Sequence, residues 1–493
     1  MSKHKISKSR YLKGLQCPKL LWLSVHEPDA EELKPDLMTQ YRFATGHKVG
    51  ALARQQFPTG KLVENTRDFS SWLAATTEAM NANHDVIFEA AFSNDQAFVA
   101  IDILRKSDSR WELIEVKSSL KVKDTYIDDL SIQYWMLTMA GISVQQASVM
   151  TLNGDCIHPD RSNLFRLHNV TDQVTARLPA VESNIESMHA TLNLALPTVT
   201  VGVHCYSPHP CPFKARCWPG LPEHHVSTLY RLDKESAFAL ERDHGISEIH
   251  HLVDEIKLTR LQQRQADAVK SNSVYISKNL AAELMKIKAP VAYLDFETIM
   301  PAIPMFNGDK PYQQIPVQFS CHIENERGDL AHVEWIAKDN SDPRRAMADT
   351  LLQACENTKT IVAYNAKFEK SCIDAIARAV PEKSERLLAL KDRFFDFLPL
   401  VRNHIYDPKF KGSFSIKSVL PALVPNTGYD TLEISNGMLA SIRLEQIVTE
   451  ALAEHEKEVV IGQLLKYCAL DSMAMVLLKQ ALEEIARRIP PTD

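Results

Sequence analysis

Acidic side chains occur in three ordered motifs in the C-terminal part of the sequence. Asp295 and Glu297 end the apolar run VAYLDFE, where a strand would direct both carboxylates to one face. Glu369 follows in YNAKFEK, and Tyr467 and Asp471 stand four positions apart, which places them on one face of a helix. A buried strand that ends in two carboxylates is costly unless a cation is held there, and Mg²⁺ or Mn²⁺ suits such oxygen ligands. These motifs predict a divalent-metal site that could grip a phosphate.

A second set of acidic residues lies in the N-terminal half. Asp102 stands in AFVAIDIL, and Glu115 and Lys117 alternate in ELIEVKSS, so a strand would point the last two to one face. If two antiparallel strands bring Asp102 beside Glu115, carboxylates ~4 Å apart repel by ~4 kcal/mol at an effective dielectric of 20. A bound Mg²⁺ or Mn²⁺ would relieve this repulsion, and Lys117 would orient a water or stabilise negative charge. The alternative is a surface ion pair between Glu115 and Lys117.

Three further residues around this second set have side chains that could support it. His47, in ATGHKVGAL, is a candidate metal ligand that would favour Mn²⁺, or else a packed or solvated histidine. Gln133 follows the E-x-K strand on a predicted helix, where it either supports the site or is an ordinary polar position. Glu89, in VIFEAAF, is a further candidate for assisting the metal.

The nine cysteines fall into two groups. A reducing cytoplasm disfavours disulfides, so the thiols in apolar surroundings are expected in the core; they are Cys156, Cys321, Cys355, Cys372 and Cys468. The remaining four lie among prolines and aromatic residues, a setting typical of metal or cluster ligands; they are Cys17, Cys205, Cys211 and Cys217. Four thiolates suit either zinc or a 4Fe–4S cluster. The C-x-x-C pairs of a zinc ribbon are absent, and four unrelated thiols are the remaining alternative.

Length and composition set limits on the class of protein. A chain of 493 residues predicts two or three domains, and a net charge of −6 excludes a generally basic nucleic-acid coat protein. No apolar run reaches the length of a membrane span, and the basic N-terminus lacks the apolar core of a signal peptide. A cytoplasmic protein is therefore expected.

Hydrophobic patterning places these motifs on an α/β fold. Apolar and β-branched content predicts strands, and apolar spacing of three to four predicts helices. The expected strands are 86–92, 97–104, 111–117, 145–152, 291–297, 317–323, 332–337 and 360–365; the expected helices are 43–57, 126–140 and 459–488. Residues 205–220 are too rich in proline for a long helix or a central strand. The expected domains are 1–220, a helical connector at 221–288 with two short helices around Gly245, and 289–493.

The N-terminal half resembles the PD-(D/E)xK nuclease superfamily in the order and spacing of Asp102, Glu115, Lys117 and Gln133. One early cysteine followed by a late trio resembles the iron–sulfur subgroup of these enzymes, which includes RecB/AddB-like recombination nucleases and a CRISPR-adaptation nuclease. The resemblance implies a restriction-endonuclease-like domain in which the cluster pins the two ends of the chain together.

The C-terminal half resembles the DEDDy exonucleases, which are DnaQ-like 3′→5′ exonucleases on an RNase H-type fold. The resemblance implies that Tyr467 orients the attacking water and that the ligands of two divalent ions are Asp295, Glu297, Glu369 and Asp471. Glutamate at position 369 departs from the usual aspartate and is one methylene longer. Asp396 is either an extra acid or a local cap, and the segment with Ser415 and Lys417 is either a phosphate site or a helix start.

Together the two halves resemble a bacterial family that fuses an iron–sulfur PD-(D/E)xK module to a DnaQ-like domain. The resemblance implies a metal-dependent nuclease with two active sites that acts on nucleic acid, on DNA rather than RNA, at free single-stranded ends. It transfers no settled biological role, so DNA repair and defence stay open as roles. Two alternatives stay open: a nucleic-acid-binding protein with degenerate sites, and an iron–sulfur redox sensor. No membrane partner is expected.

Overall fold

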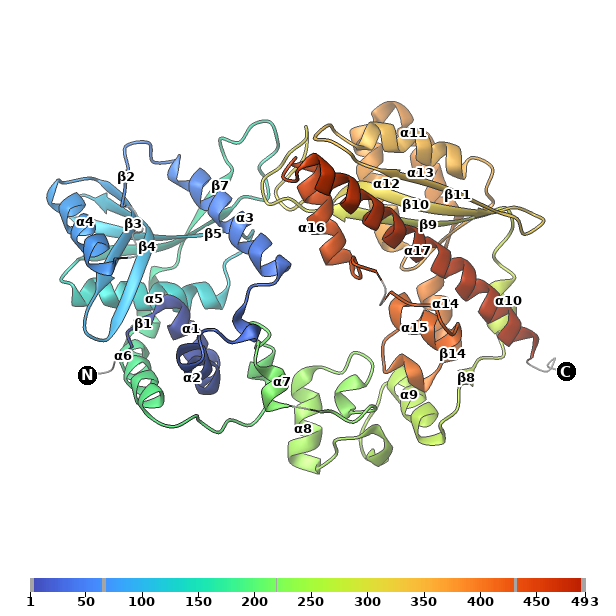
Figure 1. Ribbon diagram of the computed structural model, residues 1–493, viewed down its shortest axis with the longest axis horizontal. Helices are drawn as coiled ribbons and strands as arrows, with labels where there is room; N and C mark the ends of the chain where they lie inside the picture. The colour runs from blue at the N-terminus through green and yellow to red at the C-terminus, as the bar shows by residue number, and fades with distance from the viewer. Residues whose placement is uncertain (1–3, 64–67, 219, 430–431, 489–493) are drawn as a thin grey trace. The chain divides into compact units, whose positions relative to one another are not determined.

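A computed structural model describes the chain except for residues 1–3, 64–67, 219, 430–431 and 489–493 (Figure 1). Its contacts divide it into two compact units. The first unit comprises Met1–Gly220 and Ala302–Tyr312, and the second comprises Leu221–Pro301 and Gln313–Asp493. Both units are mixed α/β, which confirms the predicted fold class at that level.

The first unit is built on a seven-stranded sheet whose main path is β2-β3-β4-β5-β6-β7, with β1 paired to β4. Its strands are β1 (Ile6–Ser7), β2 (Lys61–Leu62), β3 (Val86–Ser93), β4 (Ala97–Ser107), β5 (Arg110–Lys117), β6 (Val144–Leu152) and β7 (Phe165–Asn169). Strands β3, β4 and β5 are antiparallel, whereas β5 and β6 are parallel and joined through a helix. All four strands predicted in this half are present.

The helices of the first unit, several of which pack on this sheet, carry several of the predicted site residues (Figure 1). They are α1 (Lys8–Gln16), α2 (Pro18–His26), η1 (Glu31–Leu33), α3 (Leu37–Arg54), α4 (Phe69–Asn81), α5 (Asp124–Met139), α6 (Thr171–Asn193), η2 (Val203–Cys205) and α7 (Lys214–Cys217). Helix α3 begins six residues before the predicted start at 43, because Asp36 caps it by accepting a hydrogen bond from the Thr39 amide at 2.8 Å. The described part of residues 205–220 contains only short helical turns, as the prolines predict.

Strand β4 changes partners at the position of Asp102. Its beginning pairs with β1 at Ala97 and Phe98, and its end pairs with β5 from Ile103 onward. Asp102 therefore lies in the gap between two ladders, where its side chain can accept a hydrogen bond from the β5 backbone. Glu89 stands opposite it on β3 with a φ of 57°, which is rare for a side chain of this kind.

The segment 302–312 belongs to the first unit although it follows the first strand of the C-terminal half. His158 and Asp309 join it to the loop after β6, since the His158 amide donates to the Asp309 carbonyl at 2.9 Å. Tyr312 donates to the Ser118 carbonyl at 2.5 Å. Ala302 packs in the same apolar cluster as Val49 and Leu152. The first unit thus draws on a stretch of sequence outside residues 1–220.

The second unit is built on a five-stranded sheet in the order β11-β10-β9-β12-β13. Its strands are β9 (Val291–Ile299), β10 (Ile315–Glu324), β11 (Leu330–Ile336), β12 (Thr360–Ala363) and β13 (Phe394–Asp396). Strands β9, β10 and β11 are antiparallel neighbours, and β12 runs parallel to both β9 and β13. A separate pair is formed by β8 (Tyr275–Ile276) and β14 (Ile405–Tyr406).

Residues 221–288 form short helices within the second unit. Helix α8 ends at Gly245, whose φ of 68° is the left-handed conformation that glycine adopts readily, so the chain turns there into a second short helix as predicted. The helices of the unit are η3 (Val226–Thr228), α8 (Lys234–His244), η4 (Ile249–His251), α9 (Arg260–Ser271), α10 (Leu280–Leu284), α11 (Arg344–Cys355), α12 (Lys367–Ala379), η5 (Pro381–Lys383), α13 (Ser384–Ala389), η6 (Leu390–Arg393), α14 (Phe397–His404), η7 (Pro408–Phe410), α15 (Ile416–Leu423), α16 (Gly437–Val448) and α17 (Glu454–Arg487).

Helix α17 has 34 residues and, among the described residues, is the one helix long and apolar enough to cross a membrane by length and composition. Half of its most apolar stretch is buried inside the unit. It lies along the sheet over β10 and β9 (Figure 1), where Gln318 of β10 donates to the Leu464 carbonyl at 2.9 Å. Its apolar face therefore serves as the cover of the sheet, as in the core helix of a globular protein.

Candidate functional site

Three carboxylates of the second unit converge on one point. Asp295 and Glu297 alternate on β9, and Asp471 reaches them from the overlying α17. Each of the three offers an oxygen within 4.8 Å of the other two. These residues, named the acid cluster below, were predicted as metal ligands, and the structure brings them together.

Burial raises the pKa of every carboxyl group of the acid cluster, and repulsion adds to the shifts of Asp295 and Glu297. Burial raises the pKa of Glu297 to about 8, and the charge of Asp471 adds to this shift. Burial, followed by the charges of Asp471 and Glu297, raises the pKa of Asp295 well above its ordinary value, and burial also raises that of Asp471. At neutral pH these groups can all ionise only if positive charge is added among them.

Glu369, the fourth predicted ligand, lies on α12 beside the acid cluster. It is only 2% exposed, and its Oε2 atom has no hydrogen-bond partner among the residues that the structure describes. Burial, with the charge of Asp396 adding to it, raises its pKa to about 8, and the Glu369 charge in turn raises that of Asp295. A buried oxygen without a donor is costly and rare, so its orientation fits a ligand that a bound cation would satisfy.

Tyr467 is held beside Asp471 by a lysine from another helix. Lys417 of α15 donates to the Tyr467 phenol oxygen at 2.8 Å and to the Ser435 carbonyl at 2.7 Å. Tyr429 donates to Asp471 at 2.5 Å. The sequence favoured a helix start at Ser415 over a role for Lys417. Ser415 does precede α15, yet its side chain makes no capping hydrogen bond. Nothing in the sequence pointed to Tyr429, which lies in a loop without periodicity.

Asp396 takes the local role that the sequence left open. Its carboxylate accepts hydrogen bonds from the amides of Leu398 and Asn365, both at 3.0 Å, and so caps α14. Asn365, in the second motif, has a φ of 76°. The short side chain of asparagine tolerates this backbone conformation, which carries the chain from β12 toward α12.

In the first unit, the predicted acid and lysine residues also meet. Asp102 accepts a hydrogen bond from the Val116 amide at 2.8 Å, which fixes it next to Glu115. Lys117 lies 2.7 Å from Glu115, and Gln133 of α5 donates to Glu115 at 2.8 Å. Asp102 and Glu115 border a cavity of about 750 Å³ together with His47, which is exposed, and Glu89. Glu89 is paired with Arg54 at 3.5 Å.

Two residues that sequence reasoning missed complete this site. Asp129, one helical turn before Gln133 on α5, lies 2.7 Å from Lys117. Lys8, the first residue of α1, lies 3.1 Å from Glu115 and 3.9 Å from Asp129. Asp129 could have been found from its four-residue spacing to Gln133, whereas Lys8 stands among other basic residues of the N-terminus and carries no pattern that sets it apart. We call this group the lysine-bound site below; it consists of Asp102, Glu115 and Asp129 with Lys8 and Lys117.

The lysines decide the charge state of this site. Although burial alone would raise it, the charges of Lys117 and Lys8 hold the pKa of Glu115 well below its ordinary value. Burial and the Glu115 charge raise the pKa of Asp102 to about 7 and also raise that of Asp129. Glu115 is thus a carboxylate compensated by ammonium groups of the chain itself.

The four cysteines of the predicted ligand set line one small cavity. Cys17 lies at the end of α1, Cys205 in η2, Cys211 in the following loop and Cys217 at the end of α7. Burial raises the pKa of Cys17 and Cys211, and the neighbouring thiols add to both shifts. The other five cysteines are buried, as predicted for core residues.

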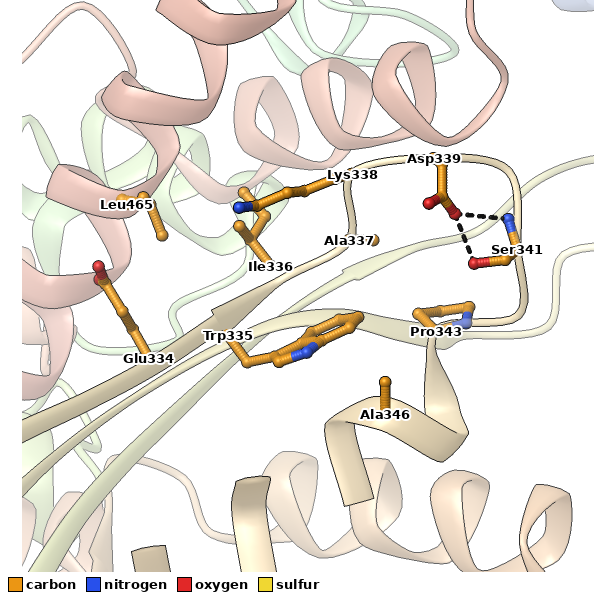
Figure 2. Close-up of a pocket in the computed structure, with 10 residues that line it drawn as sticks. All are labelled: Glu334, Trp335, Ile336, Ala337, Lys338, Asp339, Ser341, Pro343, Ala346 and Leu465. Atoms are coloured by element: carbon orange, nitrogen blue, oxygen red, sulfur yellow. Dashed lines mark hydrogen bonds between the residues drawn. The ribbon is translucent and has the colours of Figure 1, made fainter. Parts of the chain in front are cut away.

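A further cavity, of about 480 Å³, lies at the end of the edge strand β11 (Figure 2). Its lining includes Trp335, Lys338 and Leu465. Glu297, Gln318 and Ile336 form one row across the sheet, so this cavity lies two strands away from the acid cluster. None of the acid-cluster residues belongs to its described lining.

Comparison with known proteins gives a family model and distant relatives. Residues 292–415 match the model described as Domain of unknown function (DUF2779). The chain is 24% identical over 254 residues to Uncharacterized protein UU173 of Ureaplasma parvum; this match covers 47% of the chain and 36% of the relative. It is 25% identical over 224 residues to Uncharacterized protein MG366 of Mycoplasma genitalium, which covers 41% of this chain and 33% of the relative. The chain spans about a third of the length of the curated relatives it matches. The matched family range holds Asp295, Glu297 and Glu369 but ends before Tyr467 and Asp471.

Proposed function

We propose that this chain is a metal-dependent nuclease whose second unit hydrolyses phosphodiester bonds of nucleic acid from a free 3′ end. The observation that carries the proposal is the acid cluster, in which three carboxylates place oxygens within 4.8 Å of one another. The unpaired buried oxygen of Glu369 supports it, because this atom fits a fourth ligand. Such a set of hard oxygen ligands suits Mg²⁺ or Mn²⁺.

The topology of the second unit is consistent with the proposed exonuclease fold. Three antiparallel strands, β9 to β11, continue into the parallel strands β12 and β13, and α17 covers the sheet. The resemblance to DEDDy exonucleases on an RNase H-type fold rests on the three motifs, which this arrangement brings to one place. We therefore assign the ligand role to the acid cluster and Glu369, and the water-orienting role to Tyr467.

The chain's own groups would bind and orient the substrate. Divalent cations in the acid cluster would supply neutralisation of the phosphate charge and a more acidic attacking water. Tyr467 accepts a hydrogen bond from Lys417, so its hydroxyl is fixed in direction beside Asp471 and can hold a water in line with the phosphate. The first residue of α16, Gly437, borders Glu297 and Tyr467, and the N-terminal end of a helix favours an anion such as phosphate.

For the cysteine site we propose a 4Fe–4S cluster rather than zinc. Among the described residues, the acid cluster is the only set of three or more His, Cys, Asp or Glu ligands with all atoms within 4.8 Å, so the thiols are spread more widely. A zinc ion with bonds of about 2.3 Å would hold tetrahedral sulfurs only about 3.8 Å apart. The cluster would tie α1 to the segment after α6, in line with the resemblance to iron–sulfur PD-(D/E)xK nucleases.

The first unit differs from the second in one respect that disfavours metal-dependent cleavage there. Its central carboxylate, Glu115, is already compensated by Lys8 and Lys117, and a divalent cation does not fit at Glu115 while both lysines are in place. We therefore base the proposed hydrolysis on the second unit alone.

The test is cleavage of end-labelled single- and double-stranded DNA and RNA in Mg²⁺ or Mn²⁺. Wild type, Asp471→Ala and Glu115→Ala are compared, with the exposed Glu385→Ala as a matched control. We expect stepwise loss of nucleotides from 3′ ends, abolished by Asp471→Ala and kept by the control. Activity that is absent in the wild type, or equal in Asp471→Ala, would refute the proposal.

A further inference from the structure

Lys8 makes the lysine-bound site dependent on the position of a single short helix. Lys8 is the first residue of α1, which follows β1 directly. In β1, Ile6 is fully buried and its amide donates to the Gln96 carbonyl at 2.9 Å. Its ammonium lies 3.2 and 3.1 Å from the two Glu115 oxygens. The contact is not a surface pair, because only 4% of the Glu115 side chain and 23% of the Lys8 side chain are exposed.

These contacts fill the acceptor capacity of Glu115. Its Oε1 atom accepts from Lys117 at 2.7 Å, its Oε2 atom accepts from Gln133 at 2.8 Å, and Lys8 contacts both oxygens. An ionised carboxylate offers about four lone-pair positions. A divalent cation can therefore coordinate Glu115 only if one of these donors moves. Lys117 lies on the same strand as Glu115 and Gln133 lies on α5, whereas Lys8 lies on the short helix α1.

The other end of the same helix lies in the cysteine site. Helix α1 has 9 residues, which gives a length of about 13 Å. Cys17 is its C-terminal cap, and its amide donates to the Lys13 carbonyl at 2.9 Å. Gln16 donates to the carbonyls of His204 and His209, both at 2.7 Å, and so fastens the helix end to the loop that carries Cys205 and Cys211.

We propose that α1 couples the cysteine site to the lysine-bound site. When the cysteine site holds its cofactor, α1 keeps Lys8 in contact with Glu115, where Lys8 competes with a divalent cation. When the C-terminal end of α1 is freed from the cysteine site, Lys8 can leave Glu115 and the cation can bind. The coupling rests on the proposed cofactor at the cysteine site but not on cleavage by the second unit. A helix is stiff over this length, so a displacement at Cys17 is transmitted to Lys8 rather than absorbed between them.

The test measures Mn²⁺ binding by calorimetry on the full chain in an Asp295→Asn, Asp471→Asn background, where the second unit's cluster is disabled. Lys8→Gln, which removes the charge and keeps a donor, should bind Mn²⁺ about tenfold more tightly than the parent. Lys8→Arg keeps the charge, and Lys13→Ala changes another lysine of α1; both should bind as the parent does.

The coupling itself is tested by Gln16→Ala and by chelation of the metal from the cysteine site. Both treatments should tighten Mn²⁺ binding when Lys8 is present. Neither should tighten it further in Lys8→Gln, because each treatment and the substitution act on the same contact between Lys8 and Glu115.

Equal affinity in Lys8→Gln and the parent, or no Mn²⁺ binding in any variant, would overturn the proposal. Tightening by Lys8→Gln without any effect of Gln16→Ala and chelation would overturn the coupling. If Lys8→Gln does not fold, the Gln16→Ala and chelation results still decide. A wild-type chain without nuclease activity would refute the proposed function and leave these binding results unaffected.

Discussion

The ammonium of Lys417 donates to the phenol oxygen of Tyr467 at 2.8 Å, although the two residues are 50 positions apart. The same ammonium lowers the pKa of Glu297 against the effects of burial and Asp471. One lysine thus fixes the direction of the proposed water-orienting group and balances part of the charge of the acid cluster.

Removing this lysine should slow the chemical step more than it weakens substrate binding. We expect Lys417→Met to lower kcat by roughly a hundredfold with a small change in KM, because a misdirected Tyr467 no longer holds the water in line. Steady-state kinetics on a single-stranded oligonucleotide measure this. Lys409→Met, at an exposed lysine of the neighbouring turn, is the matched control and should retain wild-type kcat.

Asp471→Asn should abolish hydrolysis and yet stabilise the metal-free protein. The substitution removes one of the charges that repel each other in the acid cluster while an amide oxygen can still accept from Tyr429. We expect a loss of activity of roughly a thousandfold. The metal-free melting temperature should rise by about 2–4 °C for each kcal/mol of relieved repulsion. A lower melting temperature of the variant without metal would argue against repulsion in the cluster.

The stability of the metal-free protein should fall as the pH rises from about 4.5 to about 8. Glu297 and Glu369 have an ordinary pKa of 4.5 that burial and neighbouring charge raise to about 8 in the folded state. Between these values the folded protein holds more protons than the unfolded chain, so stability decreases with pH and levels off above 8. Melting curves with a chelator measure this, and saturating Mn²⁺ should flatten the dependence. A metal-free melting temperature that rises across this range would contradict the assigned shifts.

The cysteine site should hold iron and sulfide. We expect the anaerobically purified protein to be brown with about four iron and four sulfide per chain, and Cys205→Ser to lose the colour and to lower the melting temperature of the first unit. In the cross-link model, closing the long loop between Cys17 and Cys205 contributes about 5 kcal/mol to the stability of the folded state. Cys156→Ser, which changes a buried cysteine outside the site, should keep the iron. One zinc and no iron per chain would instead favour the zinc alternative.

The sequence by itself determined the elements and the residues that share a face within each of them. Alternation on a strand placed Asp295 beside Glu297, and a four-residue helical spacing placed Tyr467 beside Asp471, because both relations depend only on local backbone geometry. The predicted strands and the three predicted helices are present for the same reason.

Only the tertiary structure decided which residues from distant segments complete the sites. Lys8 meets Glu115 across 107 positions, and Tyr429 meets Asp471 across 42. The assignment of residues 302–312 to the first unit is of the same kind. Such contacts follow from the packing of whole helices and loops and leave no periodic pattern in the chain. From the sequence alone, a solvent-exposed lysine in a basic segment is therefore indistinguishable from one that becomes the counter-charge of a buried carboxylate.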